Sequence, residues 1–88
     1  MPRMVITHPV VDTQRWLKGK ADRVALLGQY ATEVTDHVAI DGSHNVAITL
    51  NVHDMPGLQA LMDSPPPDAV AQEESHGALL PQMVYIEK

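Results

Sequence analysis

The chain has 88 residues, of which 44% are apolar and only 3% are aromatic, with no phenylalanine and no cysteine. This length predicts a single domain over residues 1–88 with an aliphatic core. The net charge is −5, from 6 basic and 11 acidic residues, which argues against a nucleic-acid partner because such proteins present a basic surface. No apolar run is long enough to cross a bilayer and no signal-peptide pattern is visible, so we expect no membrane partner and a cytoplasmic location.

The first third of the chain predicts a strand followed by one long helix. Residues 4–8 are rich in apolar side chains and are stopped by Pro9, which is typical of a short strand. Asp12 has the character of a helix N-cap, and Trp16 and the apolar residues after it recur at helical spacing. We therefore expect a helix over residues 13–27.

The next segment, residues 32–54, alternates between apolar and polar side chains around a turn-rich stretch at residues 41–45. This period of two predicts a β-hairpin. If Asp41 faces Asn45, then His37 opposes Thr49, and aliphatic and polar residues segregate onto opposite faces.

One residue conflicts with this register. Asp36 then falls on the aliphatic face opposite Leu50, so we expect a bulge or an edge position there.

The last third predicts a second helical segment and a closing strand. Residues 55–63 carry apolar residues at helical spacing, Pro65, Pro66 and Pro67 interrupt them, and a helix can restart and run to about residue 76. Residues 82–87 predict the final strand. The element order β-α-β-β-α-β indicates an α+β fold of the ferredoxin-like type, with a four-stranded antiparallel sheet in the order 4-1-3-2 and both helices on one face.

The other face of this sheet has no helix to cover it. It is too apolar for a fully solvated surface and too polar for a sealed core, so we expect a second copy of the chain to close it into a homodimer. The residues on this face are Val5, Thr7, Thr35, His37, Ala39, Ala47, Thr49, Asn51, His53, Met83 and Tyr85.

Several segments resemble a known family. Residues 8–16 are similar to an H-x-V-x-D-x-x-x-W opening, residues 41–46 to a hairpin turn, residues 54–65 to a D…L-x-x-S-P segment, and residues 81–87 to a closing strand. Together they resemble the small dimeric α/β-barrel proteins related to the antibiotic-biosynthesis monooxygenases. The resemblance implies a dimeric ferredoxin-like barrel. Its relatives include cofactor-independent oxygenases of polycyclic compounds, haem-degrading enzymes and isomerases, and fold does not choose among them.

Two histidines on the uncovered face are the predicted catalytic residues. Histidine is the side chain suited to proton transfer near neutral pH, and His37 and His53 are both assigned to this face. The residues predicted to bind substrate beside them are Thr35, Thr49, Asn51 and Tyr85. The alternative is a purely structural role, in which these side chains are hydrogen-bonded polar residues at a dimer interface. A metal site formed by these histidines and Glu33 is disfavoured, since no H-x-H or H-x-x-x-H spacing is present.

The remaining candidates are expected to be structural. We expect His8 to pack beside or cap the first helix, Trp16 to anchor the core or interface, and His76 to be solvated near a helix C-terminus. The sequence thus predicts a dimer that binds a small apolar or aromatic compound without metal or other cofactor, as an oxygenase- or isomerase-like enzyme. The alternative is a non-enzymatic ligand-binding or structural dimer.

Overall fold

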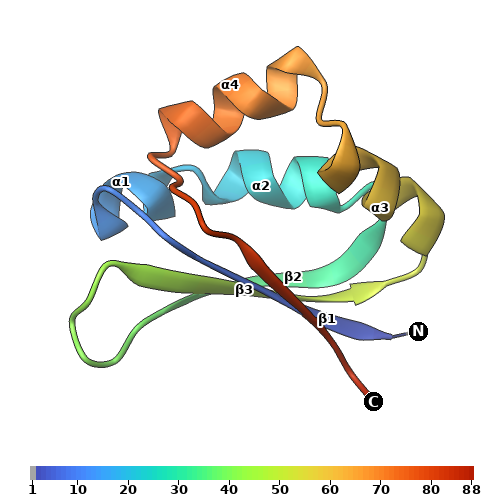
Figure 1. The fold of residues 1–88 in the computed structure, drawn as a ribbon, viewed down its shortest axis with the longest axis horizontal. Coiled ribbons are helices and arrows are strands. Elements are labelled where there is room, and N and C mark those ends of the chain that lie inside the picture. Colours follow the sequence, from blue (N-terminus) through green and yellow to red (C-terminus); the bar gives the residue numbers. More distant parts are fainter. Residues whose placement is uncertain (1) are drawn as a thin grey trace.

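One antiparallel sheet with a layer of helices on one side makes up the fold (Figure 1). A computed structural model describes residues 2–88. Within them the elements, in chain order, are β1 (Arg3–Pro9), α1 (Thr13–Lys18), α2 (Lys20–Leu27), β2 (Ala31–Val38), β3 (Asn45–Val52), α3 (Met55–Asp63), α4 (Pro67–Ser75) and β4 (Met83–Ile86). The strand order β2-β3-β1-β4 confirms the predicted ferredoxin-like sheet, with β2 and β4 at its edges.

The core lies between the sheet and the helices. Every second residue of β1 and β3 points inward and is buried, which follows from the two-residue period of a strand. Trp16, Leu50 and Leu58 are almost completely buried. The other buried apolar residues are Met4, Ile6, Val10, Leu27, Ala31, Val46, Ile48, Val52 and Ala69. The prediction of an aliphatic core around one large ring is therefore confirmed.

The predicted first helix is two helices. Asp12 caps α1, because its Oδ1 accepts the Arg15 N–H at 3.0 Å, and this bond holds the pKa of Asp12 below its ordinary value of 3.8. The chain then breaks at Gly19 before α2 begins. A Cβ atom at Gly19 would lie 2.3 Å from the ring of His76, so the absence of a side chain lets the end of α4 approach this junction.

The hairpin keeps its predicted faces but not its predicted register. His37 pairs with Ala47 and Thr35 pairs with Thr49, so the pairing is displaced by two residues from the one expected. The connecting loop is longer than predicted, since the Ala39 N–H donates to the carbonyl of Asn45 at 3.1 Å. A displacement of two residues leaves each side chain on the same face.

Asp36 lies on an edge strand, β2, as expected, but its side chain is buried. It lies opposite Ile48, and its side chain is only 4% exposed. The expected irregularity does occur in the edge strand β2, but between Thr32 and Thr35, where Glu33 has a positive φ of 53°. The bulge therefore does not move Asp36 out of the core, and an ion pair described below compensates its charge.

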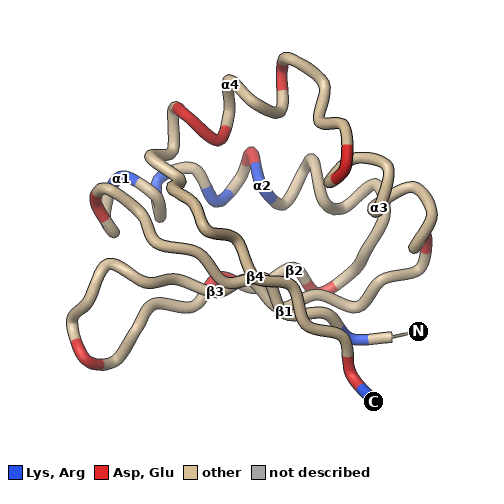
Figure 2. Tube along the Cα trace, in the orientation of Figure 1, with Lys and Arg blue, Asp and Glu red and all other residues tan. Residues whose placement is uncertain are grey.

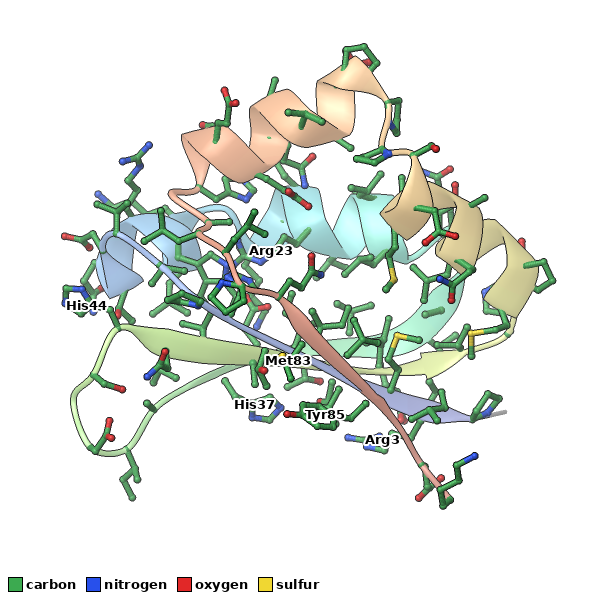
Figure 3. The ribbon with its side chains drawn as sticks, in the orientation of Figure 1. Arg3, Arg23, His37, His44, Met83 and Tyr85 are labelled. Carbon is green, nitrogen blue, oxygen red and sulfur yellow. The ribbon has the colours of Figure 1, made fainter. Side chains whose placement is uncertain are left out.

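The sheet face opposite the helices is uncovered in this single chain. Figure 3 shows His37, Tyr85 and Arg3 projecting from this side. Its residues are Thr35 and His37 on β2, Ala47, Thr49 and Asn51 on β3, Arg3, Val5 and Thr7 on β1, and Met83 and Tyr85 on β4. We call this surface the open face. None of the helices within residues 2–88 has the length and apolar character needed to cross a bilayer.

The contact between Gly19 and His76 gives a testable prediction. Gly19→Ala should destabilise the fold by about 1–3 kcal/mol, because the new methyl group overlaps the buried His76 ring. Chemical unfolding would measure this cost. In a His76→Ala background the same glycine substitution should cost much less, since the overlapping ring is gone. An equal cost in both backgrounds would show that the overlap with His76 is not the cause.

Candidate functional site

A cavity of about 400 Å³ lies between the sheet and the helix layer, beneath α4. Its volume is in the range of small-molecule pockets. Its lining residues come from β1, β3 and all four helices or the segments that follow them: Ile6, His8, Trp16, Arg23, Leu26, Leu27, Ile48, Leu61, Met62, Pro65, Ala69, Val70, Gln72, Glu73, Glu74, His76, Ala78, Leu79, Leu80 and Gln82. We call it the interior pocket. Most of its wall is apolar, and a small polar cluster interrupts it.

Arg23 is the centre of that polar cluster. It is only 6% exposed, and in Figure 3 it lies between the helices and the sheet. Its NH2 donates to Oδ2 of Asp36 at 2.8 Å and its Nε donates to Oδ1 at 3.4 Å. Both side chains are buried, with exposures of 8% and 4%. A buried charge is tolerated only when it is paired and hydrogen-bonded in this way.

The guanidinium group of Arg23 lies over the ring of Trp16. The Arg23 carbon Cζ lies 4.0 Å from the centroid of the Trp16 ring, which is the geometry of a cation–π contact. Arg23 follows Trp16 by seven residues, so the two side chains share one side of the α1–α2 segment. Trp16 is thus the core anchor that was predicted and also a wall of the interior pocket.

His76 joins the cluster from the end of α4 and is buried, so the prediction of a solvated side chain is wrong. Its Nδ1 lies 3.1 Å from NH1 of Arg23. Because arginine has only donors, Nδ1 must accept and cannot carry a hydrogen. The proton of neutral His76 therefore lies on Nε2, which is 3.5 Å from Oδ2 of Asp22. His76 is neutral as long as it accepts from Arg23.

His8 is the second histidine of the interior pocket and has the opposite tautomer. Its Nδ1 lies 3.0 Å from the carbonyl oxygen of Pro9, which can only accept, so Nδ1 donates and Nε2 carries the lone pair. The His8 ring meets Trp16 edge-on, with centroids 5.9 Å apart. Of the two histidines that line the pocket, His8 is the one whose free nitrogen can accept a proton.

The chemistry available in the pocket follows from these contacts. Arg23 can donate to an oxygen of a bound compound, and His8 can accept a proton. Within residues 2–88 there is no group of three or more His, Cys, Asp or Glu side chains arranged to hold a metal ion.

The residues predicted from sequence lie outside this pocket, on the open face. Nε2 of His37 lies 2.9 Å from Oγ1 of Thr49, and Thr35 pairs with Thr49 across the strands. His37 also borders a shallow depression of about 220 Å³. Asn51 is bound by Arg3, whose NH1 donates to its Oδ1 at 3.2 Å. The structure therefore groups four of the predicted residues in one row of contacts along β3.

The other two predicted residues lie apart from this group. His53 follows the end of β3, six positions beyond the Ala47 that pairs with His37, which is about 20 Å along a strand. Tyr85 is on β4, at the opposite edge of the sheet from the β2 residue His37. His37 and His53 are not brought together within one chain, and their catalytic role stays a prediction.

The arrangement of the chain matches solved structures of one kind. No protein-family model and no curated protein matches the sequence. A protein from Bordetella bronchiseptica assigned to the antibiotic biosynthesis monooxygenases superimposes with a TM-score of 0.73 at 13% identity, over 99% of this chain and 94% of that chain. SnoaB, a cofactor-independent oxygenase from Streptomyces nogalater, superimposes with a TM-score of 0.71 at 9% identity, over 99% and 92% of the two chains. The chain has the antibiotic biosynthesis monooxygenase fold. At these identities the likeness shows the fold alone, and confirms at that level the resemblance noted in the sequence.

The interior pocket was missed in the sequence, although a signal for it was present. Asp36 interrupts an otherwise aliphatic face, and His8 follows Met4 and Ile6 at the inward-facing period of β1. Polar residues at inward positions need partners inside the protein. Two of them in one small core indicate a buried polar cluster, which Arg23 then completes.

The buried pair gives a second prediction. Asp36→Ala should destabilise the protein by about 3–5 kcal/mol, because it leaves the Arg23 charge buried without a partner. The control is Glu33→Ala, which removes the exposed partner of Arg3 at 3.9 Å and the exposed acceptor of an Asn51 hydrogen bond, and it should cost only about 1 kcal/mol. Denaturant titration of both variants measures the difference. Similar small costs for both would show that the buried pair is not a main support of the fold.

Proposed function

We propose that this chain binds a small, largely apolar or aromatic compound in the interior pocket and acts on it as a cofactor-independent oxygenase- or isomerase-like enzyme. The observation that carries the proposal is that Arg23 and His8 are both buried, both contact Trp16, and both line a mostly apolar pocket of about 400 Å³. The fold shared with SnoaB, a cofactor-independent oxygenase, supports the same class of chemistry.

Proton removal is the step that these residues are suited to perform. Nε2 of His8 accepts a proton from an acidic C–H or phenolic O–H of the bound compound. The N–H groups of Arg23 donate to the oxygen on which negative charge develops. An isomerase returns the proton to a different carbon. In an oxygenase the resulting carbanion or phenolate reacts with the co-substrate O₂: a C–O bond forms to give a hydroperoxide, and loss of water from it leaves a carbonyl, so one oxygen atom stays on the substrate and the other leaves as water.

The alternative is a dimer that binds a ligand without turnover or serves only as a structural unit. One observation favours it: within residues 2–88 every buried side-chain nitrogen and oxygen already has a hydrogen-bond partner. Polar side chains whose buried atoms each have at least one partner without a ligand are also what a purely structural role requires.

Exchange of substrate protons distinguishes these two functions. The protein would be incubated in D₂O with a panel of naphthols and cyclic 1,3-diketones, without added flavin, haem or metal, while NMR follows deuterium entry and an electrode follows O₂ consumption. We expect catalysed exchange for at least one compound, and a loss of about 10²-fold or more in His8→Phe, which removes the proton acceptor. His44→Phe, in the exposed hairpin loop, should keep the activity. Tight binding without exchange or O₂ uptake would support the ligand-binding alternative.

We also propose that the chain forms a homodimer through the open face. This face carries exposed or half-exposed apolar side chains, among them Val5, Ala47, Met83 and Tyr85, on the side of the sheet that no helix covers. In such a dimer, residues from two copies would surround His37 and Thr49, and the roles predicted for the open face would depend on that assembly.

A charge placed in the centre of the open face tests the dimer. Ala47→Glu should convert a dimer into a monomer, because it buries a charge against the partner. Ala71→Glu introduces the same charge on the exposed side of α4 and should leave the dimer intact. Light scattering at micromolar concentration measures both. A monomeric unmodified protein would exclude the dimer, and a dimer that survives Ala47→Glu would place the interface elsewhere.

A further inference from the structure

We propose that the interior pocket selects an uncharged compound with a carbonyl or hydroxyl oxygen over a carboxylate of the same size, and that Asp36 determines this selectivity. The inference rests on the proposed function in that it takes the interior pocket as the binding site. Beyond the proposed function, it specifies that the preferred ligand is uncharged and that Asp36 is the residue responsible for this preference.

The hydrogen-bonding capacity of Arg23 is the first step. A guanidinium group has five N–H donors. Two of them, on Nε and NH2, go to Asp36, and one on NH1 goes to His76. By this count two N–H groups, one on NH1 and one on NH2, have no partner among residues 2–88. Arg23 lines the pocket and Asp36 does not, so these two N–H groups are the donors that a ligand bound there would use.

The charge around these donors is the second step. Asp36 neutralises Arg23 at 2.8 Å, and both groups are buried. His76 adds no positive charge while it accepts from Arg23. Arg15 is bound to the carbonyl oxygens of Ser75 and Glu74 and does not line the pocket.

The pocket wall contributed by α4 adds negative charge. Glu73 and Glu74 line the pocket, and Figure 2 shows acidic residues along α4. The site therefore offers donors without a net positive charge.

The cost of entry then differs between two kinds of ligand. An uncharged oxygen needs only a donor, and Arg23 supplies it. A carboxylate must lose its hydration in a site without a compensating charge, which is costly in a low-dielectric interior. Asp36→Asn keeps an oxygen that can accept from Arg23 but removes the negative charge. The guanidinium charge is then free to pair with a ligand carboxylate, which arginine binds in a bidentate geometry.

Binding of 2-naphthol and 2-naphthoate tests the proposal with one ring system and two charge states. At about pH 7 the phenol is neutral and the acid is ionised. We expect calorimetry to show that the unmodified protein binds 2-naphthol at least about tenfold more tightly than 2-naphthoate, and that Asp36→Asn reverses this order. A merely structural role of Asp36 would weaken both probes together. No preference in the unmodified protein, no binding of either probe, or no reversal in a folded Asp36→Asn variant would overturn the proposal.

Two controls make the outcome specific. Asp22→Asn makes the same charge change at an exposed carboxylate 3.5 Å from His76, and it should keep the preference for 2-naphthol. A reversal in this variant would overturn the role of Asp36. If circular dichroism shows that Asp36→Asn does not fold, the double variant Arg23→Gln/Asp36→Asn removes both charges and should gain no affinity for 2-naphthoate. A gain there would overturn the proposal.

The two proposals fail separately in this experiment. The preference between probes is measured without turnover. A preserved preference in a protein that shows neither proton exchange nor O₂ uptake would refute the enzymatic function and leave the selectivity standing. Turnover of a neutral compound, together with an unchanged preference between the two probes in Asp36→Asn, would support the enzymatic function and refute the role of Asp36 in selectivity.

Discussion

The buried ion pair between Arg23 and Asp36 is the constraint on which the rest of the molecule depends. Each charge must be paired and hydrogen-bonded because it lies away from water. That requirement joins α2, which carries Arg23, to the edge strand β2, which carries Asp36, and through His76 to the end of α4. Gly19 follows from the same arrangement, since only glycine leaves room for the His76 ring. An aliphatic core alone would not fix the relative positions of these three elements.

The fold could be predicted because it depends on local patterns. Periods of two and 3.6 residues, the Asp12 cap and the three prolines placed the elements, and their order left few topologies. The hairpin register was wrong by two residues for a physical reason. Shifting one strand by one residue moves every side chain to the other face, whereas shifting it by two residues leaves the faces unchanged. The separation of aliphatic from polar residues therefore excludes the first shift but not the second. The length of the connecting loop decides between those displacements. The turn-forming residues within 39–45 are compatible with both a shorter and a longer loop, so the sequence does not determine that length.

The interior pocket could not be predicted in the same way, because its contacts are distant in sequence. His76 binds Arg23 across 53 positions, and near a helix C-terminus a histidine is ordinarily expected at the surface. The inward polar positions of His8 and Asp36 were the local signal. They indicate that a buried partner exists but not which residue it is. The predicted open-face residues that lie within strands share one surface, since a strand's period fixes the face, whereas Ala39 and His53 lie beyond the ends of β2 and β3. The distances between the predicted residues along the sheet depend on the register.

The two surfaces of the sheet are connected through β2. Asp36 and His37 are consecutive, so one holds Arg23 inside the protein while the other binds Thr49 on the open face. β2 is an edge strand paired only to β3, and it is irregular between Thr32 and Thr35. An edge strand with a bulge is held by fewer backbone bonds than a central one. A second copy bound at His37 would therefore restrain the same strand that positions Asp36. Because a pocket ligand would interact with the Arg23 that Asp36 orients, association at one face and binding at the other act on a single short segment of backbone.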